Sequence, residues 1–133
     1  MKLPTPMINF EDERGIIKDI LSHETIDAVT IITSKKGSVR GNHYHKDTVQ
    51  YNYILEGKIE LLTQKPEQPV ESAILDTGDF AMTSAYEKHA LHALEDSVIL
   101  ILTRGPRNGI DYEKDTFRLD KPLAKSLHIS KKL

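Results

Sequence analysis

Short apolar runs separated by glycine and proline dominate the pattern of this chain. Residues 28–33 form the clearest run, a β-branched stretch that ends at the turn Lys35-Lys36-Gly37. Residues 49–55 end at Glu56-Gly57, a pair that favours a hairpin turn. Many short strands divided by such turns predict an all-β sandwich or barrel. The other candidate strands are residues 16–21, 38–45, 58–64, 70–75, 80–83, 89–94 and 98–104.

One predicted strand carries apolar residues on both of its faces. Residues 98–102 read Val-Ile-Leu-Ile-Leu, whereas a strand with one wet face alternates apolar and polar positions. We therefore expect its second face to be covered, either by the N-terminal segment or by another subunit. Tyr51 and Tyr53 lie on the pleat face opposite Gln50 and Asn52, which suits packing or an interface. These apolar faces predict a homodimer, because closed two-fold dimers are the commonest oligomers.

Helical signals are weak and confined to the end of the chain. Asp120 followed by Leu123 and Leu127, with Pro122 in the first turn, predicts one short C-terminal helix. Helices should then hold fewer than about a fifth of the residues. A chain of 133 residues and 15.1 kDa favours one domain over residues 1–133. It would include an N-terminal strand segment, residues 1–34, and a basic C-terminal tail, about residues 118–133.

Composition and charge narrow the classes of partner. With 38% hydrophobic and 29% charged residues the chain is globular in type, not disordered. A net charge of -2 argues against nucleic acid, which needs a surplus of Lys and Arg on one face. The chain has no cysteine, so disulfides, thiolate metal sites and a Cys nucleophile are excluded. The longest aliphatic run has five residues and the N-terminus lacks the apolar core of a signal peptide. We therefore expect no membrane segment and a cytoplasmic location.

Histidines supply the candidate chemistry. His43 and His45 stand two apart on a predicted strand, so both side chains point to one face. Gln50 opens the next strand, and His89 comes two hairpins later, where a barrel can bring it to the same interior. Imidazole nitrogens suit Zn, Cu, Fe and Ni, and an amide oxygen can fill a further position. The alternative is that these histidines are surface residues or hydrogen-bonded core residues.

The full spacing resembles the cupin superfamily. Its first half reads Gly37-x5-His43-x-His45-x4-Gln50-x6-Gly57, with Gln50 in the place of the usual Glu. The second half reads Gly78-x5-Ser84-x-Tyr86-x2-His89, in which Ser84 and Tyr86 replace a Pro and a Gly, and Ala93 replaces a later Asn. The resemblance implies a cupin-type antiparallel β-barrel, a double-stranded β-helix or jelly roll. It also implies a divalent metal, Zn, Ni, Fe or Mn, held by His43, His45, Gln50 and His89.

A narrower resemblance is to cupins that act on nucleotide sugars. Asp12-Glu13-Arg14-Gly15 resembles a motif of the sugar 3,5-epimerases. Residues 40–46, Arg-Gly-Asn-His-Tyr-His-Lys, with Gln50 and the later His89-Ala90-Leu91-His92, resemble the thymidine-diphosphate-sugar 3,4-ketoisomerases. Those enzymes resemble each other in transferring protons without a metal. The resemblance implies an isomerase or epimerase of polysaccharide metabolism whose small-molecule substrate is a sugar or nucleotide sugar.

Residue roles follow from that chemistry. Removing a proton beside a ketone needs a base and an acid, and we expect His43 and His45 to serve, with Tyr86 as a further acid. Arg40, Arg14 and Arg104 are candidates to bind a diphosphate, because a guanidinium donates two parallel hydrogen bonds. We assign no ligand role to His92 and no role to His128. Two other functions stay open at this point, a metal cupin of another reaction class and a non-enzymatic cupin that binds a small ligand.

Overall fold

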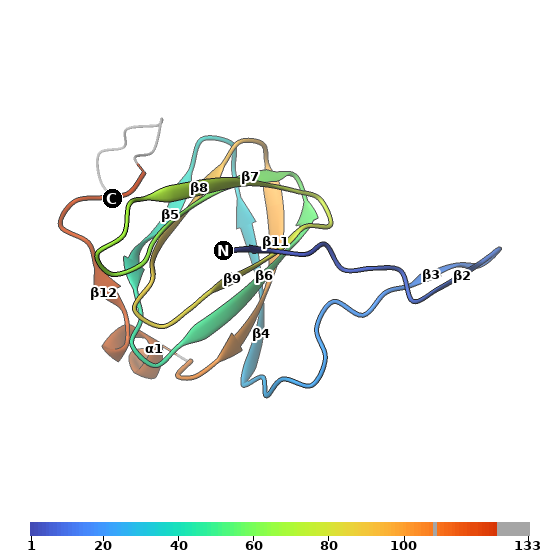
Figure 1. Cartoon of the computed structure of the whole chain (residues 1–133), viewed down its shortest axis with the longest axis horizontal. Helices are drawn as coiled ribbons and strands as arrows, with labels where there is room; N and C mark the ends of the chain where they lie inside the picture. The colour runs from blue at the N-terminus through green and yellow to red at the C-terminus, as the bar shows by residue number, and fades with distance from the viewer. Residues whose placement is uncertain (108, 125–133) are drawn as a thin grey trace.

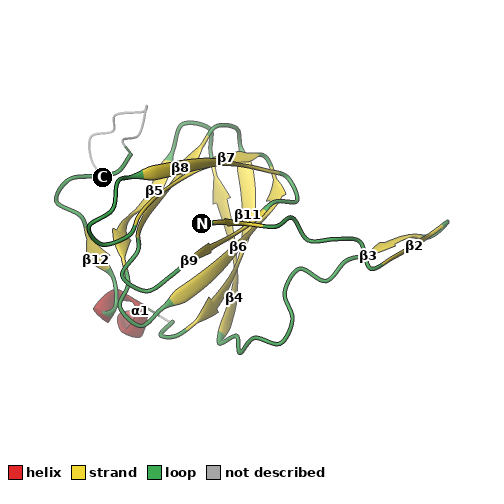
Figure 2. Ribbon diagram, viewed as in Figure 1, coloured by secondary structure: helices red, strands yellow, loops and turns green. Residues whose placement is uncertain are grey.

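The computed structural model describes residues 1–107 and 109–124 of the chain. Nearly all of its regular structure is strand, and the strands lie in two facing five-stranded sheets (Figures 1 and 2). The first sheet has the order β1-β9-β6-β11-β4, where β1 is Lys2–Leu3, β9 Phe80–Thr83, β6 Val49–Glu56, β11 Ser97–Arg104 and β4 Ala28–Ser34. The second sheet has the order β12-β5-β10-β7-β8, where β12 is Phe117–Arg118, β5 Val39–Tyr44, β10 Lys88–Ala93, β7 Lys58–Gln64 and β8 Glu71–Asp76.

All pairings between these strands are antiparallel, and neighbours in a sheet are often distant in sequence. This is a jelly roll, so the predicted fold class is confirmed. A small separate sheet joins β2 (Phe10–Asp12) and β3 (Gly15–Ile17) in an arm that projects from the body (Figure 1). Within the described ranges, no helix has the length and apolar character that a bilayer crossing demands.

The space between the two sheets is filled at one end by an aliphatic core. Ile54 of β6 and Ile99 of β11 are fully buried and sit opposite one another in the register. Ile59 and Leu61 of β7 face them from the second sheet. Ile99, Ile59 and Leu61 are each followed two positions along by another buried side chain, as the period of a β-strand requires.

The doubly apolar strand has both faces covered. Ile99 and Ile101 of β11 belong to the core between the sheets, whereas Leu100 and Leu102 face outward. The outer face forms a second cluster with Tyr51, Tyr53 and Phe80. Residues of the N-terminal segment pack over this cluster, namely Leu3, Ile20, Leu21 and Ile26. The N-terminal segment therefore provides the predicted cover, and the two tyrosines serve in packing.

The predicted C-terminal helix is wrong in its position. The helix in the described chain is α1, Ile110–Lys114, while residues 120–124 are not helical and Leu127 lies outside the described residues. The reason is a tertiary contact of Asn42 in β5. Its side-chain oxygen accepts hydrogen bonds from the backbone of Leu123 and Ala124, and its amide donates to the Ala124 carbonyl. These bonds hold the segment in a series of bends and not in a helix, which local sequence could not reveal.

Candidate functional site

Three histidines meet between the two sheets, beyond the aliphatic core. His43 of β5 and His89 of β10 are direct partners in the strand register, and His45 follows the end of β5. Ring centroids are 4.7 Å apart for His43 with either other ring, and 5.3 Å apart for His45 and His89. One nitrogen from each ring lies within 4.8 Å of the others, and all three residues are buried.

A glycine lets the two histidine-bearing strands approach. Gly41 has a φ of 90°, and a Cβ there would lie 2.9 Å from the carbonyl oxygen of His89. The register between β5 and β10 shifts just after His89. A residue with a side chain at position 41 would push this irregularity away from His43. The glycine of the motif is therefore a geometric requirement of the site.

Backbone carbonyls fix the orientation of two of the rings. His45 Nδ1 lies 2.9 Å from the carbonyl oxygen of Asp115, and His89 Nδ1 lies 3.2 Å from that of Glu87. A carbonyl can only accept, so each neutral ring donates from Nδ1 and carries its lone pair on Nε2. His43 Nδ1 is buried and has no hydrogen-bond partner within the described chain.

Burial keeps these imidazoles neutral. It lowers the pKa of His43 to about 3, with the neighbouring His89 and His45 adding to the effect. Burial also lowers the pKa of His89 to about 4, against the opposing hydrogen bond to Glu87. The pKa of His45 is lowered for the same reason. At neutral pH the three rings are therefore uncharged, and each keeps a nitrogen lone pair.

Two of the histidines, His43 and His89, line a cavity of about 220 Å³, and His45 lies behind them in the cluster. Gln50 lines it, with its amide nitrogen 3.4 Å from Thr103 Oγ1. Tyr112 of α1 also lines it and places its hydroxyl 3.4 Å from His45 Nε2, where it can donate to the lone pair. Two arginines complete the rim. Arg40 binds the Thr33 carbonyl and Ser34, while the Arg107 guanidinium lies 4.4 Å from the centre of the Tyr112 ring.

A buried carboxylate holds α1 against the site. Asp115 accepts hydrogen bonds from the backbone of Lys46 and Asp47 and from the hydroxyl of Thr48. Burial opposes its ionisation, but these hydrogen bonds prevail and lower the pKa of Asp115 below its ordinary value. Because the carbonyl of the same residue binds His45, Asp115 ties the helix segment, the β5–β6 loop and the histidine together.

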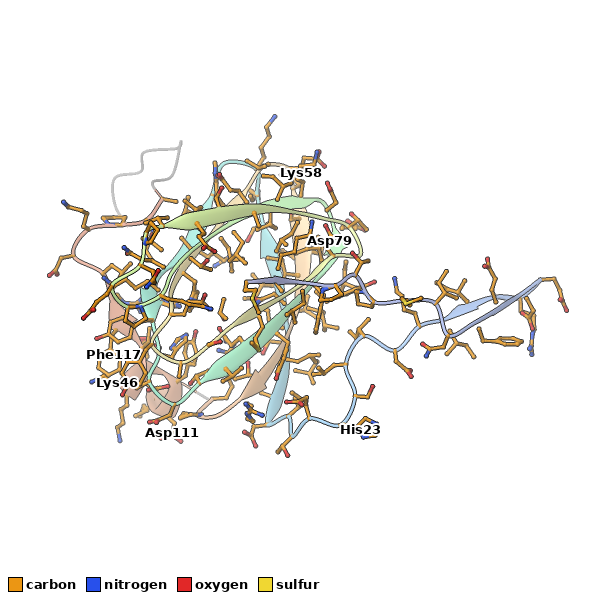
Figure 3. All side chains as sticks on the ribbon, viewed as in Figure 1. His23, Lys46, Lys58, Asp79, Asp111 and Phe117 are labelled. Atoms are coloured by element: carbon orange, nitrogen blue, oxygen red, sulfur yellow. The ribbon has the colours of Figure 1, made fainter. Side chains whose placement is uncertain are left out.

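Tyr86 does not lie at this cavity. Its ring stacks on Tyr44, which in turn stacks on Phe117, with centroids 6.5 and 5.2 Å apart. The Nζ atom of Lys46 lies 4.4 Å from the centre of the Phe117 ring (Figure 3). Tyr44 faces outward because it follows the inward His43 on β5. The tyrosine expected to be an acid therefore borders an outer groove of about 610 Å³.

Two of the three predicted arginines also lie elsewhere. Arg14 stands in the turn between β2 and β3, with its side chain 80% exposed and paired with Asp12. Arg104 follows the inward Thr103 on β11, so it points outward and pairs with Glu24. Only Arg40 of the predicted set lines the cavity.

The residues that sequence reasoning missed are Tyr112, Arg107 and Asp115. No local period marks them, because they lie after the last long strand and reach the site only through the fold. Arg104 was the arginine predicted to bind a diphosphate in this part of the chain, but Arg107 is the one that lines the cavity. His92, on the opposite face of β10, contacts Glu60 and is not part of the cluster.

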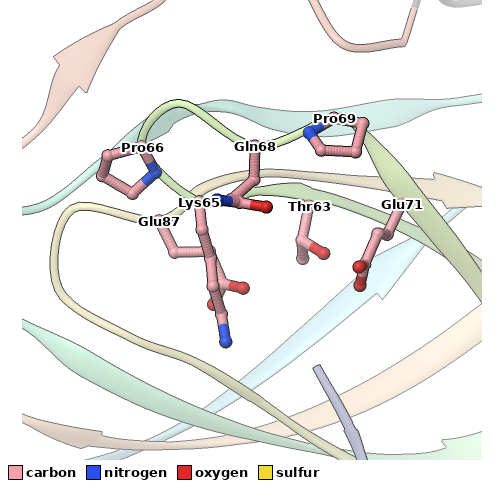
Figure 4. Close-up of a pocket in the computed structure, with 7 residues that line it drawn as sticks. All are labelled: Thr63, Lys65, Pro66, Gln68, Pro69, Glu71 and Glu87. Carbon is pink, nitrogen blue, oxygen red and sulfur yellow. The ribbon is translucent and has the colours of Figure 1, made fainter.

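A larger cavity, about 430 Å³, lies under the β7–β8 connection (Figure 4). Polar residues dominate its lining, among them Thr63, Gln68, Glu71 and the buried Glu87. None of the three clustered histidines lines it. The smaller cavity is the candidate site because its lining combines two of the clustered imidazoles with Tyr112 and two arginines.

Comparisons with known proteins agree on family and fold. Residues 10–95 match the family profile described as Polysaccharide biosynthesis C-terminal domain. Comparison with curated protein sequences finds no significant match. The stretch 10–95 includes all four residues of the cupin-like ligand set.

Several solved structures share the fold. The chain superposes on a dTDP-4-dehydrorhamnose 3,5-epimerase from Sulfolobus tokodaii with a TM-score of 0.66 and 19% identity, covering 80% of this chain and 70% of that one. It also superposes on QdtA, a sugar 3,4-ketoisomerase from Thermoanaerobacterium thermosaccharolyticum in complex with TDP, with a TM-score of 0.68 and 20% identity. This match covers 84% of this chain and 82% of QdtA. A third match is the capsular polysaccharide assembling protein CapF from Staphylococcus aureus, with a TM-score of 0.65 and 17% identity. It covers 87% of this chain and 33% of CapF. The chain thus has a cupin jelly-roll fold and spans a third of the last protein.

Proposed function

The chain belongs to the polysaccharide biosynthesis C-terminal domain family, and from this premise we propose that it is a sugar-modifying isomerase or epimerase. Its reaction would be the transfer of a proton at a carbon beside the carbonyl of a keto sugar. The substrate would be a sugar carried on a nucleoside diphosphate, as suits the nucleotide-sugar enzymes that share the fold. A homodimer and a cytoplasmic location remain predictions from the sequence.

The observation that carries the proposal is the set of neutral imidazoles around a ring-sized cavity. His45 and His89 have Nδ1 held by backbone carbonyls, so their Nε2 lone pairs are available toward the other members of the cluster. His43 lies between them. A neutral imidazole is a base, and a core that needed only packing would not bury three of them together.

The size of the cavity limits what it can hold. Pockets for whole small-molecule ligands measure roughly 300–1,000 Å³. A cavity of about 220 Å³ suits a single sugar ring, so the nucleoside diphosphate must lie outside. Arg40 and Arg107 stand where the cavity opens. Their guanidinium groups can bind a diphosphate that leaves the cavity between them.

The proposed reaction needs a base on one side of the sugar and an acid on the other. His43 would take the proton from the carbon next to the carbonyl, which leaves an enediolate. The Tyr112 hydroxyl, beside His45 Nε2, would supply a proton to the oxygen or to the second carbon. In an epimerisation the proton from Tyr112 would reach the opposite face of the same carbon. In an isomerisation it would reach the neighbouring carbon, while the substrate hydroxyl proton moves to the former carbonyl oxygen. The proton held by His43 would then pass to the Tyr112 oxygen through solvent, which returns the enzyme to its starting state.

A metal-dependent reaction is the second candidate, and the same cluster favours it. Three imidazole nitrogens within 4.8 Å, two with Nδ1 bonded to carbonyls, fit a divalent ion such as Zn, Ni, Fe or Mn. His43, His45 and His89 would hold it, with Gln50 near enough in the cavity lining to offer an amide oxygen. When bound, such an ion would polarise the substrate carbonyl as a Lewis acid. A cupin that binds a sugar without turning it over is the third reading.

One experiment separates the three. The protein is incubated in heavy water with a dTDP-linked 4-keto sugar, with and without a chelator, and deuterium incorporation is followed by mass spectrometry. Incorporation that the chelator leaves unchanged supports the histidine base. Incorporation that the chelator abolishes and metal restores supports the metal. Binding in a thermal-shift assay without incorporation from any keto sugar tested would overturn the enzymatic proposal.

Matched substitutions locate the chemistry. We expect His43→Asn to lower the exchange rate roughly 10²–10⁴-fold, since general base catalysis is worth that much. His23→Asn is its control, because His23 is exposed and far along the chain from the cluster. Tyr112→Phe should slow exchange about tenfold or more, whereas Tyr86→Phe should leave it unchanged. The opposite order for the two tyrosines would show that the outer groove, not the cavity, is the active site.

A further inference from the structure

The outer groove lies on the face of the second sheet that points away from the three histidines. Strand β5 runs between β12 and β10 in this sheet, and Tyr44 at its end lines the groove. The groove measures about 610 Å³, and its lining also includes Tyr86, Lys88, Arg118, Asp120 and Lys121. No described residue lines both this groove and the histidine cavity. The groove is therefore a separate feature, which the proposed reaction does not use.

Three stacked aromatic rings end at the groove. Phe117 of β12 stacks on Tyr44 with ring planes 22° apart, and Tyr44 stacks on Tyr86 with planes 24° apart. Lys46 lies over the Phe117 ring at one end of this ladder. Tyr86 forms the other end and is 52% exposed, so one face of its ring is open. Near-parallel rings that end in an open face offer a stacking position to one more flat ring.

Tyr86 has a backbone conformation that suits glycine. Its φ is 65°, in the left-handed region, where a bulky side chain is an outlier. Hydrogen bonds fix the turn, because the Tyr86 amide donates to the His45 carbonyl and the Ser84 amide donates to the Glu87 side chain. A half-exposed ring gains little from packing, so stability alone would favour glycine at this position. Strained residues of this kind cluster at functional sites and ligand clamps.

Two lysines stand beside the open ring. Lys88 comes directly before the inward His89 on β10, so its side chain points to the same side of the sheet as Tyr86. Lys121 lies on the segment that follows β12, the strand that flanks β5 on its other side. Within the described ranges, neither ammonium group has an ion-pair or hydrogen-bond partner. Both charges are therefore available to a ligand.

The groove is positive on an acidic chain. Asp120 is the one acid among the described residues that line it, and the guanidinium of Arg118 is already paired with Glu113. Lys88 and Lys121 outnumber that acid, although the whole chain has a net charge of -2. This contrast in charge selects an anionic ligand for the groove.

We propose that the outer groove binds a nucleoside diphosphate, with the base on Tyr86 and the phosphates on Lys88 and Lys121. A nucleobase is flat and continues the ladder of near-parallel rings, which a puckered sugar ring does not. Lysine binds phosphate as a compact point charge. A volume of about 610 Å³ lies within the range of pockets for whole small-molecule ligands, roughly 300–1,000 Å³. The proposal does not rest on the proposed function, since the groove and the cavity share no lining residue.

The first test locates the nucleotide, because Arg40 and Arg107 at the cavity could bind the same compound. The full chain is treated with a lysine-acetylating reagent with and without dTDP, and each site is followed by peptide mass spectrometry. We expect dTDP to slow the acetylation of Lys88 and Lys121 severalfold. Lys35, an exposed lysine in the turn at the opposite end of β5, should react at the same rate in both samples.

The second test measures affinity by calorimetry in the Arg107→Gln background, which weakens any site at the cavity. Tyr86→Gly suits the left-handed backbone and should lower dTDP affinity roughly tenfold, since base stacking is worth that much. Tyr86→Phe keeps the ring and should keep the affinity. Lys88→Gln combined with Lys121→Gln should weaken binding, whereas Lys35→Gln, the same change of charge outside the groove, should not. Circular dichroism of each variant checks that the sheets remain.

Each other outcome overturns the proposal. Equal acetylation of Lys88 and Lys121 with and without dTDP means that no nucleotide lies in the groove. Equal protection by inorganic pyrophosphate means that the groove takes any polyanion and does not use the ring. Unchanged affinity of Tyr86→Gly gives the same answer. Loss of all dTDP binding in Arg107→Gln alone places the nucleotide at the cavity, and stronger protection by an acidic oligosaccharide than by dTDP makes the groove a glycan site.

Discussion

The two ends of the space between the sheets are built by the same strands for opposite purposes. On β6 the inward residues run from Gln50 to Ile54, and on β11 they run from Thr103 to Ile99. At one end these strands pack aliphatic side chains into a continuous core. At the other end Gln50 of β6 lines a cavity together with His43 and His89, which come from the facing strands β5 and β10. The difference lies in the side chains, since both ends share one backbone register.

This contrast shows how the fold divides stability from chemistry. Dense packing at the aliphatic end stabilises the sheets, so the other end can tolerate a cavity and a buried nitrogen without a partner. The histidine end would stabilise the protein better if it were apolar.

The largest expected effect is at the aliphatic end. Ile54→Ala removes a fully buried side chain and should lower the free energy of unfolding by about 2–5 kcal/mol. Urea denaturation measures it. The control is Ile74→Ala at an exposed position, which should change stability by less than about 0.5 kcal/mol. Deuterium exchange by the folded Ile54→Ala protein should equal that of wild type, and a loss of exchange without unfolding would mean that the two ends are coupled.

Acid should act on the histidine end. The pKa values of His43 and His89, about 3 and about 4 in the folded protein, lie below the ordinary value of 6.5. Between these values the unfolded chain binds more protons, so stability is complete above the ordinary pKa and is lost as pH falls. As the pH falls from about 7 to 5, His43 and His89 should each lower the free energy of unfolding by about 2 kcal/mol.

Urea titrations at several pH values measure this loss. The window lies above the ordinary pKa of the carboxylates, so it isolates the histidines. His43→Asn should reduce the slope, because one titrating group is gone. A free energy of unfolding that does not change over this range would mean that the rings are already solvated in the folded protein.

The smallest expected effect has the opposite sign. His43→Leu replaces a buried ring, whose Nδ1 has no partner in the described chain, by an apolar side chain. Unfolding should then cost about 1 kcal/mol more at neutral pH, because an unsatisfied buried polar atom is removed. Thermal and urea denaturation measure the gain, and exchange activity should be lost with it. A destabilised His43→Leu protein would show that the imidazole contributes to packing, as a core histidine does.

Local pattern determined the strands and the pairing of two histidines. The period of two along a strand placed His43 and His45 on one face, and the glycine and proline positions predicted most of the turns. The apolar residues at 98–102 predicted that the second face of this strand would be covered. These features depend on neighbouring residues alone, so a single sequence contains them. The cupin resemblance placed His89 beside them, which spacing within one strand could not do.

Tertiary structure decided what closes the site and what stands beside it. Tyr112 and Arg107 reach the cavity because Asp115 anchors the α1 segment to the β5–β6 loop, a contact across 67 residues. Tyr86, predicted as an acid, stacks on Tyr44 outside the sheet. Residues 123 and 124 are not helical as predicted, because their backbone N–H groups donate hydrogen bonds to the side chain of Asn42. Each outcome depends on long-range contacts whose partners have no fixed spacing, so no local period encodes them and only the folded chain brings them together.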